Sequence, residues 1–195
     1  MEIIAHRRNT LEQLADTPRH LGVEVDIRTD RRRLIIHHDP LTEGEDFEAW
    51  LAAYAHGCLI LNVKEEGLED PLLTLMAKAG IERFFFLDQS FPFLMRTARR
   101  GERRCAVRVS EYESVETALA LSGQVEWVWL DSFTDALPAP ETCQRLHAAG
   151  FKVCVVSPEL QGRSAETEIP RLRRHFDANG FEFAAVCTKA PDLWT

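Results

Sequence analysis

The chain has 195 residues, 45% of them hydrophobic and 28% charged, which is the composition of an ordinary globular protein with one domain. Its 23 basic and 31 acidic residues leave a formal net charge of −8, and this charge disfavours sequence-independent binding to nucleic acid or to an anionic membrane. No apolar run approaches the length of a membrane span, and no basic-then-apolar segment opens the chain, so we expect no membrane insertion.

Seven glycines divide the chain into repeating units. Each follows a helix-like stretch and shortly precedes an apolar strand-like run, and a glycine past the end of a helix adopts the left-handed conformation without steric cost. They are Gly22, Gly57, Gly80, Gly101, Gly123, Gly150 and Gly180. With the N-terminal segment, the runs after these glycines predict eight strands, at residues 2–6, 23–28, 58–64, 81–88, 105–109, 125–131, 151–156 and 181–187.

The longest interval between these glycines contains an additional apolar stretch at residues 34–39. It follows a polar turn at residues 30–33, directly after the second predicted strand. This pattern predicts a β-hairpin extension, which would bring His37 or His38 over the mouth of the fold.

The segments between the strands have the pattern of helices. Asp70 and Pro71 predict an N-cap and a first-turn proline for a helix whose apolar face ends at Gly80. Residues 140–149 and 169–176 repeat this pattern before the next glycines. Strands that alternate with helices at this period are parallel and are joined by crossover helices.

Eight strand–helix units predict an α/β fold, specifically a compact (β/α)8 TIM barrel that spans residues 1–195 as a single domain. The alternative is an open doubly wound sheet. Its nucleotide-binding G-x-G-x-x-G turn is absent after the first strand, where residues 6–10 read His-Arg-Arg-Asn-Thr. We therefore favour the barrel.

The cysteines indicate the redox environment. They are odd in number and widely spaced, and Cys105, Cys154 and Cys187 lie inside apolar strand-like runs. This pattern predicts buried free thiols in a reducing compartment, not zinc ligands, and a cytoplasmic location. The five are Cys58, Cys105, Cys143, Cys154 and Cys187.

Candidate metal ligands lie on the second and third strands. Chemistry in a TIM barrel takes place where the strands run into the following loops. Glu24 and Asp26 are two residues apart on one strand, so both point to one face, and Asn62 lies on the next strand. Two carboxylates and an amide oxygen are ligands that hard cations prefer. These three residues therefore predict one site for a divalent cation, Mg²⁺ or Ca²⁺.

Cations and imidazoles occur at the ends of the same strands. Arg7 and Lys64 are suited to holding a phosphate. His6 and one histidine of the hairpin could stand on opposite sides of a reacting group as general base and general acid. A metal ion, an anion clamp and an acid–base pair together favour phosphoryl transfer.

Five short motifs occur in order in the first third of the chain. They are Ile-Ile-Ala-His-Arg at residues 3–7, Asn-Thr-Leu at 9–11, Val-Glu-Val-Asp at 23–26, His-Asp-Pro at 38–40 and Leu-Asn-Val-Lys at 61–64. This series resembles the glycerophosphodiester phosphodiesterase family, which belongs to the phosphatidylinositol-phospholipase-C-like superfamily of TIM barrels.

The resemblance implies a role for each matching residue. It implies that His6 and His38 are the catalytic acid–base pair, that Glu24 and Asp26 bind the metal, and that Arg7 and Lys64 hold the phosphate. It also implies that a neighbouring hydroxyl of the substrate attacks phosphorus, and that water then opens the resulting cyclic phosphate while the histidines exchange roles.

The chain departs from the family pattern at three places. Arg8 stands where the family has glycine, and the loop before Asn9 is shortened. Asn62 stands where the family has a third acidic ligand. Only residues 41–57 fill the interval in which the family has a small domain.

The sequence predicts a metal-dependent phosphodiesterase that hydrolyses a glycerophosphodiester or a similar small polar phosphodiester. The acidic charge and the lack of an amphipathic membrane segment favour a small-molecule substrate over bilayer phospholipid. The alternative, motivated by the three departures, is a catalytically degenerate barrel that binds a phosphorylated ligand or partner. A sugar-phosphate isomerase is disfavoured because residues 157–159 and 188–191, after the last two strands, lack paired glycines.

Overall fold

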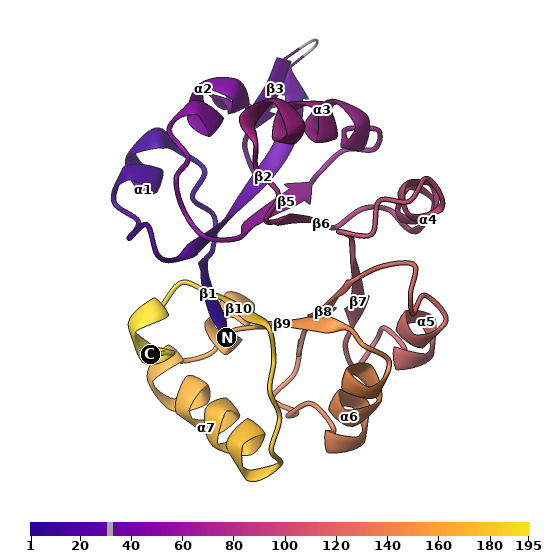
Figure 1. Cartoon of the computed structure of the whole chain (residues 1–195). Helices are drawn as coiled ribbons and strands as arrows, with labels where there is room; N and C mark the ends of the chain where they lie inside the picture. Colours follow the sequence, from indigo (N-terminus) through magenta and orange to yellow (C-terminus); the bar gives the residue numbers. More distant parts are fainter. Residues whose placement is uncertain (31–32) are drawn as a thin grey trace. The chain divides into compact units, whose positions relative to one another are not determined.

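The computed structural model describes residues 1–30 and 33–195, and its elements form two units (Figure 1). The N-terminal unit comprises residues 4–105, and the C-terminal unit comprises residues 1–3 together with residues 106–195. Residues 31 and 32 of the predicted turn lie outside the described residues. Each unit has an α/β architecture in which parallel strands alternate with helices.

Parallel strands form the centre of the N-terminal unit. β1 (Glu2–Ala5) pairs with β2 (Gly22–Asp30), β2 with β5 (Leu59–Val63), and β5 with β6 (Phe84–Leu87). The register places Val23 opposite Leu59 and Asp26 opposite Asn62. The helices of this unit are α1 (Leu11–Ala15), α2 (Phe47–Ala52), α3 (Glu69–Ala79) and α4 (Phe91–Arg99).

The second half of β2 has an antiparallel partner. β3 (Arg33–Ile36) pairs with it, so that Ile27 lies opposite Ile36, and the short β4 (Glu45–Asp46) pairs antiparallel with β3. His37 and His38 follow β3 directly. The backbone N–H of His37 donates to the Asp26 carbonyl at 3.0 Å, which ties this segment to the strand that carries both carboxylates.

The C-terminal unit contains four parallel strands in the order β7 (Ala106–Val109), β8 (Trp127–Leu130), β9 (Lys152–Val156) and β10 (Ala185–Thr188). Its helices are α5 (Val115–Leu119), α6 (Pro140–Ala148) and α7 (Ala165–Ala178). Two short 3-10 helices, η1 (Pro158–Gln161) and η2 (Pro191–Leu193), follow β9 and β10. The predicted apolar face of the last long helix is buried through Ile169, Leu172 and Phe176.

The helix predicted around Pro71 exists, but its N-cap is not the predicted one. α3 begins at Glu69, so Asp70 and Pro71 lie in its first turn, and the N-cap residue is Leu68 without a side-chain hydrogen bond. Gly80 ends the helix in the left-handed conformation, at φ 66°, as expected for a C-terminal glycine. Leu72 and Met76 form its buried face.

Gly22 has a different role from the predicted helix-end glycine. It is the first residue of β2 and has no positive φ. A Cβ atom built on Gly22 would lie 2.6 Å from the Cys58 carbonyl oxygen and 2.8 Å from Cγ1 of Ile4. Glycine is required here because the Cys58 backbone, just before β5, and the Ile4 side chain of β1 leave no room for a Cβ atom.

The last predicted strand is shorter than expected. The sequence predicts a strand over residues 181–187, whereas β10 covers only Ala185–Thr188. Phe181 instead continues the end of α7, because its N–H donates to the Phe176 carbonyl at 3.0 Å. Residues 181–184 therefore form an irregular connection.

All five cysteines are free and buried, in agreement with the prediction of unpaired interior thiols. Among the described residues, no helix is both long and apolar enough to cross a lipid bilayer.

Candidate functional site

The candidate site lies in the N-terminal unit, where β1, β2 and β5 run into their following loops. His6 and Arg7 come directly after β1, Glu24 and Asp26 lie within β2, and Lys64 comes directly after β5. Glu24 and Asp26 have no exposed surface. Burying a carboxylate costs free energy unless it has hydrogen-bond or ion-pair partners. The partners of these two residues therefore define which side chains belong to the site.

Glu24 accepts hydrogen bonds at both of its oxygens. Oε1 accepts from Nδ2 of Asn62 at 2.8 Å, and Oε2 accepts from the backbone N–H of Arg7 at 2.7 Å. Nε2 of His6 lies 3.8 Å from Oε2. Burial raises the pKa of Glu24 to about 7 and the Asp26 carboxylate adds to the rise, while the bonds from Asn62 and Arg7 oppose it.

Asp26 is surrounded by an amide and two cations. Its Oδ2 accepts from Nδ2 of Asn9 at 2.8 Å and lies 3.5 Å from Nε of Arg7. Its Oδ1 lies 3.2 Å from Nζ of Lys64, which is also 3.2 Å from Oδ2 of Asp88. Asp26 is therefore paired with Arg7 and Lys64, the residues predicted to hold a phosphate.

His38 lies beside a large open cavity. The cavity has a volume of about 620 Å³, and Arg7, Asn9 and His37 also line it. Nδ1 of His38 is 2.8 Å from Oδ1 of Asp39, and this hydrogen bond holds the pKa of Asp39 below its usual value.

Six of the seven predicted site residues form one contact network: His6, Arg7, Glu24, Asp26, Asn62 and Lys64. The seventh, His38, shares the cavity with Arg7 but forms no hydrogen bond or ion pair with the other six among the residues described here.

Two residues of the site have a strained backbone. Arg7 has φ 51° and Asp88 has φ 61°, in the left-handed region that residues other than glycine rarely adopt. Such strain persists only where the surroundings impose it, and it is frequent at functional sites. Here it holds the Arg7 N–H against Glu24 and the Asp88 carboxylate against Lys64.

Three residues of the site had no role in the sequence prediction. Asn9 holds Asp26 twice, because its Oδ1 also accepts from the Asp26 backbone N–H at 3.1 Å. Arg28 donates to the His38 carbonyl from Nε at 3.1 Å and from Nη2 at 2.9 Å. Asp88 pairs with Lys64. Asn9 lies in the Asn-Thr-Leu motif and Asp88 ends a predicted strand, but no pattern in the sequence indicates a role for Arg28.

The residues present fit a hard divalent cation. Oδ1 of Asn62 is buried and accepts no hydrogen bond from any described residue, so the amide has an open acceptor beside the two carboxylates. No group of three or more His, Cys, Asp or Glu residues is placed to hold a metal ion in the described part of the chain. A cation at Glu24 and Asp26 would therefore need the Asn62 oxygen as its third protein ligand.

Comparison with known proteins supports an α/β fold of the TIM-barrel type. No family model matches the sequence, and no curated protein matches it. A crystal structure of glycerophosphodiester phosphodiesterase from Agrobacterium tumefaciens str. C58 matches with a TM-score of 0.71 and 13% identity over 100% of this chain and 97% of that chain.

Two further structures with other activities in their names also match. A mutant tryptophan synthase alpha-subunit from the hyperthermophile Pyrococcus furiosus gives a TM-score of 0.62 at 13% identity, over 99% of this chain and 88% of that chain. Phosphoribosyl anthranilate isomerase from Thermus thermophilus gives a TM-score of 0.50 at 14% identity, over 96% of this chain and 86% of that chain. At these identities the likeness concerns the fold alone, and function has to be argued from the site.

Proposed function

We propose that this chain is a metal-dependent phosphodiesterase that hydrolyses a glycerophosphodiester or a similar small polar phosphodiester. The observation that carries the proposal is the pair of buried carboxylates, Glu24 and Asp26, in contact with His6, Arg7, Asn62 and Lys64. The similarity in fold to a glycerophosphodiester phosphodiesterase supports it. The proposal includes a closed (β/α)8 barrel of one domain, in which β3 is part of a hairpin extension. It also includes a cytoplasmic location, which the free thiols favour.

Arg7 and Lys64 are suited to bind the phosphate of the substrate. Both contact Asp26, and we expect phosphate oxygens to compete for these contacts when substrate binds. Arg7 offers a guanidinium that can donate two parallel hydrogen bonds to a phosphate, whereas Lys64 offers a point charge. Asp88 keeps the Lys64 ammonium at the end of β5 during this exchange.

His6 and His38 are suited to move protons on either side of the phosphorus. Each lies beside a carboxylate, His6 near Glu24 and His38 near Asp39, and such a partner orients an imidazole. One imidazole takes the proton of the attacking substrate hydroxyl, and the other gives a proton to the leaving alkoxide. This step forms a cyclic phosphate and releases the alcohol, and the roles reverse when water opens the ring.

The oxygens of Glu24, Asp26 and Asn62 would hold one divalent cation, Mg²⁺ or Ca²⁺. When bound, such a cation supplies Lewis-acid polarisation of a non-bridging phosphate oxygen.

A turnover assay tests the proposal. The purified protein is incubated with glycerophosphodiesters that carry different alcohols, with Mg²⁺, Mn²⁺, Ca²⁺ or a chelator, and the release of glycerol phosphate is measured. We expect metal-dependent turnover that falls by about a hundredfold or more in His6→Ala and in His38→Ala. His20→Ala is the matched control, because His20 is exposed and belongs to no part of the site, and it should keep full activity.

A second candidate function is binding of a phosphorylated ligand without catalysis. It is favoured by the contacts that Arg7 and Lys64 make with Asp26 and by the neutral amide of Asn62, since both reduce the negative charge available to a metal ion. Tight binding of glycerol phosphate with no turnover under any metal would support this candidate and contradict the phosphodiesterase.

A further inference from the structure

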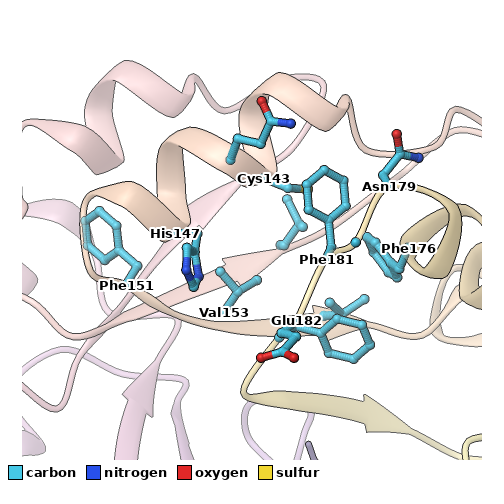
Figure 2. A pocket seen from close by; sticks show the side chains of 13 residues that line it. Cys143, His147, Phe151, Val153, Phe176, Asn179, Phe181 and Glu182 are labelled. Atoms are coloured by element: carbon cyan, nitrogen blue, oxygen red, sulfur yellow. The ribbon is translucent and has the colours of Figure 1, made fainter.

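A partly open cavity of about 290 Å³ lies within the C-terminal unit and contains none of the candidate catalytic residues. Its floor is formed by side chains of β8 and β9, among them Leu130, Val153 and Val155. Its walls come from α6, from the end of α7 and from the irregular residues 181–183 (Figure 2). This volume is close to the lower limit for sites that bind small organic molecules.

Four phenylalanines contribute to the lining of this cavity. Phe151 and Phe176 are buried, whereas Phe181 and Phe183 are only half-buried although both residues line the cavity. The ring centroids of Phe176 and Phe183 are 4.9 Å apart, so these two rings form a packed wall. Phe181 and Phe183 belong to the irregular residues 181–184 that precede β10.

The charge at the rim of the cavity favours a cation. Glu182 lies between Phe181 and Phe183, and its carboxylate forms no ion pair or hydrogen bond with any residue of the described chain. The last turns of α6 and α7 also border the cavity, through His147 and Phe176. Helix C-termini carry partial negative charge, so the carboxylate and both helices favour positive charge at this position.

We propose that this cavity binds a small organic ammonium ion with an apolar or aromatic body. The body packs among the phenyl rings and the aliphatic floor, and the ammonium group lies at the rim against Glu182. The faces of the phenyl rings add attraction for the cation, since the negative face of an aromatic ring attracts ammonium groups. This site goes beyond the proposed phosphodiesterase activity and does not depend on it.

Anionic and uncharged ligands of the same shape fit the cavity less well. A carboxylate would be repelled by Glu182 and by the two helix C-termini, whereas an uncharged alcohol gains no attraction from them. The arrangement therefore predicts an order of affinity in which the amine binds more tightly than the alcohol, and the alcohol more tightly than the acid.

The experiment uses three probes that share a phenyl ring and a two-carbon linker. They are 2-phenylethylammonium, 2-phenylethanol and 3-phenylpropanoate, and their binding to the full-length chain is measured by NMR chemical-shift titration at pH 7. We expect 2-phenylethylammonium to bind about fivefold more tightly than 2-phenylethanol, with shifts confined to residues that line the cavity.

Two variants and one control make the test specific. In Glu182→Gln the amine should lose its advantage over the alcohol, while alcohol binding stays unchanged. In Val153→Phe, which fills the floor, both probes should lose binding. Glu141→Gln on α6 removes an exposed carboxylate that does not line the cavity, and it should behave as the wild type. Equal binding of amine and alcohol in the wild type, an unchanged ratio in Glu182→Gln, or no saturable binding of any probe would each overturn the proposal.

Discussion

Glu24 is an acidic side chain without exposed surface, next to a second buried carboxylate. Burial and the Asp26 charge raise its pKa from 4.5 to about 7. The folded protein therefore holds a proton on Glu24 over a pH interval in which the unfolded chain has lost it. The folded state loses stability through this group as the pH rises from 4.5 to about 7, by on the order of 3 kcal/mol in total.

This linkage predicts a pH dependence of stability. In the presence of a chelator, the denaturant midpoint of the wild type should fall between pH 5 and pH 8. Glu24→Gln removes the titrating group, so its midpoint should fall less over the same interval. Unfolding curves by circular dichroism at four pH values measure both slopes. Parallel pH profiles for the two proteins would contradict the raised pKa of Glu24.

Asn62 is the residue through which the proposed metal affinity can be adjusted. Asn62→Asp adds a third carboxylate beside Glu24 and removes the Nδ2 donor that now bonds it. We expect the variant to melt at a lower temperature than the wild type in chelator, and to gain more stability from added Mg²⁺ or Ca²⁺. Asn62→Leu keeps the side chain buried without an oxygen and should gain least. An identical cation-induced shift in all three proteins would argue against Asn62 as a ligand.

Arg28 connects elements that are separate in the sequence. From β2 its guanidinium reaches the carbonyl of His38 after β3 and, at 3.4 Å, the carbonyl of Lys64 after β5. A lysine ammonium cannot make these parallel contacts. We expect Arg28→Lys to lower the kcat of the proposed reaction between about tenfold and a hundredfold with little change in KM, because His38 loses its fixed position.

Arg33→Lys provides the comparison for this effect. Arg33 lies on β3, and its exposed side chain pairs with Asp30. The substitution should leave kcat unchanged. If Arg28→Lys also retained full activity, Arg28 would not position His38.

At Gly22 the neighbouring strands lie so close that any larger residue should lower the stability of the fold. A methyl group at this position would meet the Cys58 carbonyl oxygen at 2.6 Å, so a backbone must shift. We expect Gly22→Ala to destabilise the fold by roughly 3 kcal/mol or more, because the overlap involves backbone and not a flexible side chain. Gly101→Ala has open space but a positive φ of 91°, and should cost only about 1 kcal/mol. Chemical denaturation compares the two, and equal losses would contradict the steric explanation.

Sequence periodicity predicted the elements whose signals are local. The apolar run at residues 58–64 contains β5, and Pro140 begins α6 as expected. The pattern could not distinguish Gly22 from a helix-end glycine, because the reason for this glycine is the Cys58 carbonyl on another strand. It also extended the last strand through residues 181–184, whose alternating phenylalanines have the pattern of a strand.

The site likewise combines features that a local sequence pattern shows with contacts between residues that are distant in the sequence. Glu24 and Asp26 share a face because of strand geometry, which the sequence shows directly. The double contact of Asn9 with Asp26 joins residues 17 positions apart through a loop, and no periodic pattern encodes it. The open cavity beside His38 likewise follows from packing after folding.

At the scale of the whole molecule, fold and chemistry are separate properties. Proteins whose names refer to a phosphodiesterase and to a tryptophan synthase subunit both match nearly the entire chain at 13% identity. Likeness over the full length therefore leaves several reactions open, and a function can be proposed only from the residues of the site.

The distribution of thiols gives a prediction for the entire chain. All five cysteines are buried, and burial raises the pKa of the Cys143 thiol to about 11, so it remains protonated at neutral pH. We expect far less than one thiol per native chain to react with Ellman's reagent within minutes. In guanidinium chloride all five thiols should react. Rapid reaction of several thiols in the native state would show that the interior opens readily.

The left-handed backbone at Arg7 and Asp88 limits how far this protein can be made resistant to heat. Glycine at either position would relax a conformation that costs about 1–2 kcal/mol, and it would at the same time delete a charge beside Asp26 or Lys64. The chain thus gives up part of its folding free energy at the two positions where the proposed chemistry needs a charged side chain. A more durable version of this protein would have to gain its stability elsewhere.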